Sequence, residues 1–184
     1  MRLGDEFYRQ DVLTVAPGLL GKILCRLVVS QVLRRRITEV EAYRGEEDTA
    51  CHARFGHTKR TEVMYLAGGH AYVYLCYGVH HMLNVVTGAI DQPQAVLIRG
   101  LAGLHGPGRL TKALGITGAD NRTDLRTSEF MWIEDDGFIP EGIDTAPRIG
   151  IGYASPEDQV RPWRMMLRGT GVLNATSTGF PLAS

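Results

Sequence analysis

The sequence predicts an α+β fold: a single domain with a curved, mostly antiparallel sheet, a protruding β-hairpin and a few helices. Three observations support this prediction. The chain has 184 residues, many short segments are rich in β-branched and aromatic residues, and few segments are helical in pattern. A chain of this length ordinarily forms one domain, which buries about 70% of the surface of the unfolded chain. We therefore expect residues 1–184 to form a single domain.

The predicted strands are short and follow one another closely, as in antiparallel sheets. They cover residues 22–30, 32–43, 71–77, 82–87, 94–101, 131–134, 148–153 and 163–168. The first two are nearly contiguous and predict a hairpin. The strand 71–77 stops at Gly78, which permits a sharp turn, so that Tyr77 is expected at an exposed hairpin tip.

Helices are predicted in two places. Residues 10–20 predict a short apolar helix with Pro17 as a kink or a start. A tight Gly-Pro-Gly turn at 106–108 precedes an apolar helical run over 110–115. Residues 45–57 are polar and predict a loop or a short helix.

Several features predict a cytoplasmic protein. The sequence has no run of about 18 apolar residues, so no membrane span is expected. Residues 1–6 are acidic and lack the apolar core of a secretory signal. The three cysteines, Cys25, Cys51 and Cys76, are odd in number and widely spaced, which indicates reduced thiols rather than a disulfide framework.

The charge balance does not by itself favour a nucleic-acid binder. The formal net charge is zero, whereas such domains usually carry a basic excess. Acidic residues gather in 120–144. Basic residues gather in 34–36, 59–60, 161–168 and around Arg99, Arg109 and Lys112. This distribution is compatible with one basic face or with evenly solvated charge.

The segment 39–43 is a candidate for acid–base chemistry. Alternate residues of a strand share a face, so Glu39, Glu41 and Tyr43 are expected on the same side. Two carboxylates this close repel, and one pKa rises unless a cation compensates. A carboxylate beside an aromatic ring suits a general base next to a planar ligand. The alternative is an exposed edge strand with solvated acids.

Small residues surround His52 and predict a close approach of the backbone to another group. A metal site would use Cys51, His52 and His57, or His80 and His81. Neither set has the spacing of a zinc site, so no metal is expected. A buried histidine without a ligand is the alternative.

The segment 72–78 is unusually rich in tyrosine. Tyr72 and Tyr74 are expected to share a face, and Tyr77 is expected at the tip. An exposed ring can enter a base stack and fill the gap left by an extruded nucleotide. The alternative is a core strand with its tyrosine hydroxyls at the rim.

Arg99 follows an apolar run and, if buried, requires a carboxylate partner. Glu41 is the natural partner, and the pair is expected to keep Glu41 ionised at neutral pH. Asn84 is a further polar residue within a predicted strand.

These motifs, taken together and in this order, resemble the alkyladenine DNA glycosylase family, the 3-methyladenine DNA glycosylase type of animals and many bacteria. The matching segments are 19–22, 39–43, 48–53, 72–78, 84–85, 95–99, 106–110, 148–152 and 162–169. The resemblance extends from about residue 13 to about residue 172, and this collinearity makes it far more specific than any single motif.

The resemblance implies roles for three catalytic residues. Glu41 matches the general base that deprotonates the attacking water. Arg99 matches the arginine that positions this water together with Glu41. The backbone carbonyl of Ile149 matches a third ligand of the water.

The resemblance also implies a pocket for an extruded base. Tyr43 matches a ring that stacks on one face of the base, with His52 and Tyr74 on the other face. The main-chain amide of His52 matches a donor to the base edge. Asn84 matches a residue that disfavours the exocyclic amine of guanine, and Tyr77 matches the side chain that intercalates.

The implied protein is a monofunctional DNA glycosylase that hydrolyses the N-glycosidic bond of a damaged purine. The resemblance implies double-stranded DNA as partner, no cofactor, no membrane, a monomer, and the cytoplasm of a bacterium, associated with the nucleoid through DNA. The sequence departs from the family pattern at Pro17, Val79, Arg109 and 80–81. Its neutral charge departs as well, which predicts weak non-specific DNA binding.

Three alternatives remain open. A non-catalytic damage-binding module on the same fold would keep the tyrosines but could lose Glu41 or Arg99, and this sequence has both. A nucleoside hydrolase for small molecules would not need an exposed Tyr77. An RNA-binding relative rests only on the likeness of the fold to the C-terminal domain of formyltransferases.

Overall fold

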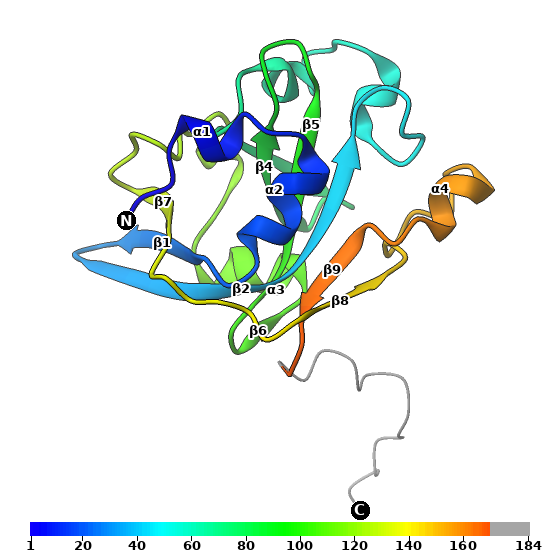
Figure 1. Ribbon diagram of the computed structural model, residues 1–184. Helices are drawn as coiled ribbons and strands as arrows, with labels where there is room; N and C mark the ends of the chain where they lie inside the picture. Colours follow the sequence, from blue (N-terminus) through cyan, green and yellow to red (C-terminus); the bar gives the residue numbers. More distant parts are fainter. Residues whose placement is uncertain (170–184) are drawn as a thin grey trace, which may run out of the picture.

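The computed structural model describes residues 1–169 and has the predicted α+β fold (Figure 1). One curled, nine-stranded sheet forms the body of the domain, with the strand order β3-β4-β5-β2-β1-β7 along its main path. Every strand pair in the described part of the chain is antiparallel. Residues 170–184 of the predicted single domain lie outside this description.

The strands follow the predicted order, except that two short strands, at 104–105 and 143–146, were not expected and the predicted strand 148–153 is absent. Their bounds are β1 (Ile23–Val28), β2 (Gln31–Arg44), β3 (Ala71–Cys76), β4 (His80–Thr87), β5 (Gln94–Leu101), β6 (Leu104–His105), β7 (Met131–Glu134), β8 (Ile143–Ala146) and β9 (Arg164–Leu167). The predicted strand 148–153 is wrong, because this segment is a loop. The strand nearest to it is β8, which pairs with β9.

The loop at 148–153 has clear physical causes. Gly150 has φ 78°, a conformation that does not continue a strand. The side chain of Arg148 is buried in an ion pair, and the amide of Ile149 donates to a carboxylate instead of a neighbouring strand. Periodicity alone cannot reveal such tertiary contacts.

The strand β2 organises the fold, because it pairs with different strands along its length. Its first part forms the predicted hairpin with β1, and its second part lies between β5 and β9. The register with β5 shifts on both sides of Glu39. Such an irregularity bends a strand and re-aims its side chains. The strand β2 is long and bent in Figure 1, and its second half, which carries Glu41, lies between β5 and β9.

Short helices complete the domain. They are α1 (Asp5–Tyr8), α2 (Val12–Leu19), α3 (Pro107–Ala113) and α4 (Pro156–Val160), with 3-10 turns η1 (His52–Phe55), η2 (Glu62–Tyr65) and η3 (Gly118–Asp120). The side chain of Asp11 caps α2 by accepting from the amide of Leu13. Pro17 lies inside α2 near its end and not at its start.

The main core lies between the sheet and helices α2 and α3. It includes Val12 and Leu19 from α2, Leu110 from α3, and Val40 and Ile98 from the sheet. This core fixes one face of β2 and β5. Among the described residues, no helix is long and apolar enough to cross a membrane.

Candidate active site

Glu41 is the most deeply buried carboxylate on β2, with no exposed surface. It has three polar neighbours. The amide of Ile149 donates to Oε1 at 2.7 Å, and the hydroxyl of Tyr43 donates to Oε2 at 2.9 Å. Nε of Arg99 lies 3.4 Å from Oε1. Two segments that are distant in sequence, β5 and the loop at 148–153, therefore meet β2 at this carboxylate.

Burial raises the pKa of Glu41 above its ordinary value, because desolvation disfavours the ionised form. The charge of Arg99 and the hydrogen bonds from Ile149 and Tyr43 oppose this rise but do not cancel it. That the pair with Arg99 keeps Glu41 ionised at neutral pH stays a prediction, since Arg99 lowers this pKa while burial raises it by more. A carboxylate with a raised pKa is well suited to accept a proton.

Glu39 and Glu41 share one cation, Arg99, which was expected to pair with Glu41. Nε of Arg99 lies 3.3 Å from Oε1 of Glu39, which also receives a hydrogen bond of 3.1 Å from Arg164. Arg164 pairs with Glu41 in the backbone register of β9 and β2. The repulsion between the two carboxylates is therefore offset by two guanidinium groups.

The loop that carries Ile149 is held by a buried ion pair that sequence analysis missed. Both nitrogens of the Arg148 fork donate to Asp48, at 2.5 and 2.8 Å, and Nη1 also donates to the carbonyl of Ala42. Neither side chain of the pair is exposed. The guanidinium lies 4.8 Å from the centre of the Tyr43 ring. This clamp fixes the amide of Ile149 against Glu41.

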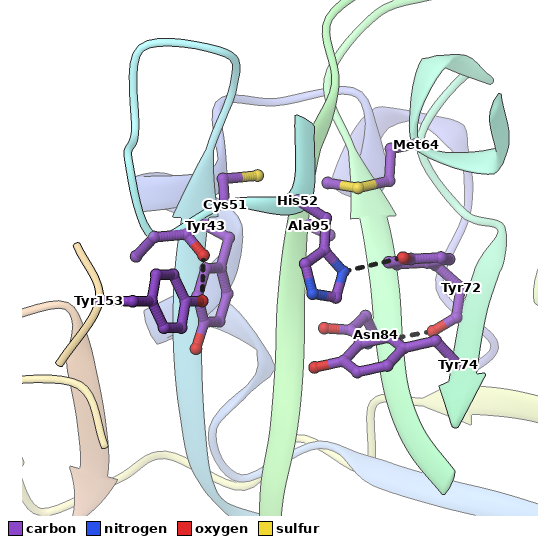
Figure 2. Close-up of a pocket in the computed structure, with 10 residues that line it drawn as sticks. Tyr43, Cys51, His52, Met64, Tyr72, Tyr74, Asn84, Ala95 and Tyr153 are labelled. Atoms are coloured by element: carbon purple, nitrogen blue, oxygen red, sulfur yellow. Dashed lines mark hydrogen bonds between the residues drawn. The ribbon is translucent and has the colours of Figure 1, made fainter. Parts of the chain in front are cut away.

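An aromatic slot lies next to Glu41 (Figure 2). Tyr43 connects the two, because its ring lines the slot and its hydroxyl donates to Glu41. Its empty volume is about 320 Å³, including the part open to solvent. Figure 2 shows Tyr43 and Tyr153 on one side, facing His52, Tyr74 and Asn84. The lining residues are Tyr43, Ala50, Cys51, His52, Met64, Tyr72, Tyr74, Asn84, Ala95 and Tyr153. Flat rings on facing sides suit a planar ligand.

His52 begins the turn η1 and points into the slot (Figure 2). Its Nδ1 lies 2.9 Å from the Tyr72 hydroxyl, and its ring centre lies 4.6 Å from that of Tyr74. Burial, followed by the charges of Arg60 and Arg54, lowers the pKa of His52 to about 4. The imidazole is therefore neutral at pH 7 and forms part of an uncharged wall.

Asn84 lies directly opposite Tyr72 in the register of β3 and β4. Its side-chain amide donates to the carbonyl of Tyr72 at 3.1 Å and to that of Met82 at 3.4 Å. Asn84 is almost fully buried. These bonds fix its orientation at the slot, because both amide protons have partners.

Tyr77 lies outside the slot, at the tip of the hairpin formed by β3 and β4. It is 93% exposed, and its φ of 50° is followed by a φ of 71° at Gly78. Two successive positive φ values match the tight turn expected from the glycine. The ring of Tyr77 is therefore exposed to solvent, and its residue has a backbone conformation that residues other than glycine seldom adopt.

Sequence analysis predicted much of the slot but missed one wall. Tyr153 was assigned to a strand that does not exist. It lines the slot instead, and its hydroxyl donates to the carbonyl of Ala50 at 2.9 Å. Cys51 and Met64 also line it, and only packing reveals this. In the described part of the chain, no group of three His, Cys, Asp or Glu residues is arranged to hold a metal ion.

Known proteins resemble this chain over nearly its whole length. The sequence model of the family described as methylpurine-DNA glycosylase (MPG) matches residues 6–105 and 101–171. A relative from Anaeromyxobacter dehalogenans (strain 2CP-C) is 46% identical over 178 residues, covering 92% of this chain and 85% of the relative.

Two further relatives give the same result. One from Methanocella arvoryzae is 40% identical, covering 96% of this chain and 98% of its own. One from Borreliella afzelii (strain PKo) is 40% identical, and the match covers 89% of this chain and 94% of the relative. All three are named "Putative 3-methyladenine DNA glycosylase". The chain belongs to the methylpurine-DNA glycosylase family.

Proposed function

We propose that this protein is a monofunctional DNA glycosylase. It extrudes an alkylated or deaminated purine from duplex DNA and hydrolyses the N-glycosidic bond, leaving an abasic site. The observation that carries this proposal is a fully buried glutamate, Glu41, with a raised pKa and three polar neighbours beside an aromatic slot. Family membership and the names of the relatives support the same reaction.

Glu41 acts as the general base. It takes a proton from a water molecule while the water oxygen bonds to C1′ of the sugar and the C1′–N9 bond breaks. The bonding electrons leave with the purine, so that a cationic alkylpurine departs as a neutral molecule. A neutral deaminated purine takes up one proton from water to leave as a neutral molecule. The transition state has a cationic sugar, which the negative charge of Glu41 stabilises. Arg99 and the backbone carbonyl of Ile149 position the water.

The aromatic slot receives the extruded base. Tyr43 stacks on one face, and His52 and Tyr74 stack on the other. Stacking favours electron-poor cationic rings by on the order of 1 kcal/mol. The neutral state of His52 supports this role, because a charged imidazole would repel a cationic base. The main-chain amide of His52 donates to the base edge, and Asn84 disfavours the exocyclic amine of guanine.

Tyr77 enters the duplex and occupies the space of the extruded nucleotide. Its exposure at the hairpin tip supports this role, because intercalation requires a ring that is not packed elsewhere. Damaged bases cost less to unstack, by a few kcal/mol, which contributes to selection.

The whole chain, residues 1–184, acts as one glycosylase domain and works as a monomer on double-stranded DNA with damaged purines. No cofactor or metal takes part in the proposed steps. None of the residues matched to a role in the family is a lysine that could form a Schiff base with the sugar, so cleavage of the DNA strand is not expected. The place of action is the bacterial cytoplasm, at the nucleoid.

Excision kinetics on a panel of duplexes test the proposal. The panel carries 3-methyladenine, 7-methylguanine, hypoxanthine or ethenoadenine, each at a single site. We expect release of at least one free base and an abasic strand that breaks only on heating in alkali. Tight binding without release would identify a damage-binding module instead. Release from free nucleosides but not from duplexes would identify a nucleoside hydrolase.

A further inference from the structure

The pairing of β2 with β5 contains a β-bulge at Arg99. In the Cα register, Glu39 lies opposite Gly100, and the next residue of β2 lies opposite Ile98. Arg99 therefore has no opposite residue in these two described strands. A bulge bends its strand and re-aims the side chain of the extra residue. The bulge of β5 thus contributes to the direction in which Arg99 meets the glutamates of β2.

Arg99 is shared between two carboxylates through one nitrogen. Its Nε lies 3.3 Å from Oε1 of Glu39 and 3.4 Å from Oε1 of Glu41. Because these distances are nearly equal, a small displacement of the guanidinium strengthens one contact and weakens the other. The position of Arg99 therefore depends on the other groups that hold Glu39.

Arg164, on β9, holds Glu39 from the other side of β2. Its Nη1 donates at 3.1 Å to Oε1 of Glu39, the same oxygen that Arg99 contacts. Both β5 and β9 pair with β2 at this point, so the two guanidinium groups come from opposite neighbours of one strand. The side chain of Arg164 is 19% exposed and that of Glu39 is 7% exposed. Their contact is therefore little screened by salt.

The same guanidinium also holds the loop that carries Ile149. Nε of Arg164 donates at 3.0 Å to the carbonyl of Pro147, which lies two residues before Ile149. Different nitrogens of one planar group therefore bind Glu39 and the loop. A lysine has a single nitrogen at the end of a flexible chain and does not reproduce this geometry.

The ionisation of Glu41 responds to the position of Arg99. The groups that face Glu41 from β2, β5 and the loop are Glu39, Tyr43, Arg99, Arg148 and the amide of Ile149. Among these, the charge of Arg99 lowers the pKa of Glu41, and the charge of Glu39 raises it. A displacement of Arg99 from Glu41 towards Glu39 should therefore raise the pKa of Glu41.

We propose that Arg164 is a positioning residue for the hydrolytic step. Through Glu39 it sets the position of Arg99, and through Pro147 it sets the position of the Ile149 carbonyl. This inference rests on the proposed function and adds the residue that ties the two proposed water ligands to each other. Arg164 is not among the described residues that line the aromatic slot, so it acts on the rate and not on the binding of the base.

The first test follows the ionisation of Glu41 in the free protein. Carbon-13 NMR of the side-chain carboxyl gives its midpoint, and Glu41→Gln identifies the signal. Arg164→Gln should move the midpoint to higher pH by on the order of 1 unit, because Glu39 loses a cation and draws Arg99 towards it. Arg164→Lys keeps the charge, so its midpoint should stay close to that of the wild type. An unchanged midpoint in Arg164→Gln would overturn the inference.

The second test is single-turnover excision of 7-methylguanine, at a pH above the midpoint of every variant. Arg164→Gln should lower the rate roughly 10- to 100-fold, since both proposed water ligands lose a contact, while the affinity for the lesion duplex stays the same. Arg164→Lys should keep the midpoint but not the full rate, because one nitrogen does not hold both Glu39 and the loop. Weaker binding of the lesion duplex by Arg164→Gln at an unchanged rate would overturn the inference.

Arg168→Gln is the matched control for both tests. Arg168 directly follows β9 and pairs with Asp144 instead of Glu39, so its loss should leave the midpoint and the rate unchanged.

A double variant tests the path through Glu39. In the Glu39→Gln background, Arg99 is no longer drawn away from Glu41, so Arg164→Gln should shift the midpoint less than it does in the wild type. Equal shifts in both backgrounds would show that the two charges act independently and would overturn this path. Absence of wild-type excision on the lesion panel would instead contradict the proposed function, on which the NMR midpoints do not depend.

Discussion

Two buried acid–arginine pairs lie side by side in this fold, and they differ in geometry. Asp48 and Arg148 form a forked pair with contacts of 2.5 and 2.8 Å. Glu41 and Arg99 approach only to 3.4 Å, and Arg99 divides its charge between two glutamates. The first geometry saturates the carboxylate with donors. In the second pair, desolvation by burial raises the pKa of Glu41, and the contact with Arg99 lowers it by less.

This difference in geometry suggests different roles: the Asp48–Arg148 pair supports a loop, and Glu41 beside Arg99 takes part in the proposed chemistry. A saturated ion pair holds its charge firmly and is suited to fix a loop. An undercompensated carboxylate exchanges a proton more readily and is suited to react. The first pair also serves the second, because the amide of Ile149, next to Arg148, donates to Glu41. Each of the following predictions tests this division of roles.

The largest effect is expected for Glu41→Gln on excision. The amide cannot accept the proton of the attacking water, so the single-turnover rate should fall by roughly 10²–10⁴-fold or more. Binding of the lesion duplex should remain, because the slot is unchanged. Glu39→Gln is the matched control, since Glu39 also contacts Arg99, whereas the bonds from Tyr43 and from the Ile149 amide go to Glu41; its loss of rate should be much smaller. Full activity of Glu41→Gln would remove the general-base assignment.

The second effect concerns folding stability. Arg148→Met leaves Asp48 buried without a cation, which should lower the free energy of unfolding by about 3–5 kcal/mol. Arg99→Met should cost less, because Glu41 can take up a proton and keeps two other donors. Urea denaturation at neutral pH measures both variants. Equal losses of unfolding free energy in the two variants would show that the two ion pairs do not differ in their contribution to stability.

The sequence predicted which strand residues meet at Glu41 better than it predicted the loop that supports them. Glu41, Tyr43 and Arg99 lie on strands, where alternation predicts a shared face and a short contact between neighbours. Arg148 and Tyr153 lie on a loop whose shape depends on Asp48, about a hundred residues away in sequence. Strand patterns are local and predict the sheet, whereas a loop defined by a distant ion pair has no periodic signal.

A third prediction concerns the pH dependence of excision. The substrate is 7-methylguanine, which is already cationic and needs no protonation. Its excision rate should fall at acidic pH as Glu41 takes up a proton, with a midpoint above the ordinary pKa of glutamate. Arg99→Gln removes the largest opposing charge, so the midpoint should move to higher pH. An unchanged midpoint would show that Arg99 does not act on the charge of Glu41.

The smallest effect is on stability as a function of pH. The folded-state pKa of Glu41 is raised, so the folded protein binds more protons than the unfolded chain between the two pKa values. Glu41 therefore weakens the fold as pH rises from about 4.3, the unfolded value, through the folded pKa. Glu41→Gln removes this loss and should raise the melting temperature at pH 7 relative to the wild type.

The same comparison at pH 4 supplies the control for this last prediction. There the wild-type glutamate is protonated in the fold and resembles the amide, so the two melting temperatures should coincide. A difference that stays constant between pH 4 and pH 7 would mean that packing, and not ionisation, distinguishes the two side chains. A difference that grows with pH would locate the cost of this pair in the charge of Glu41, whose contact with Arg99 is longer than the contacts between Asp48 and Arg148.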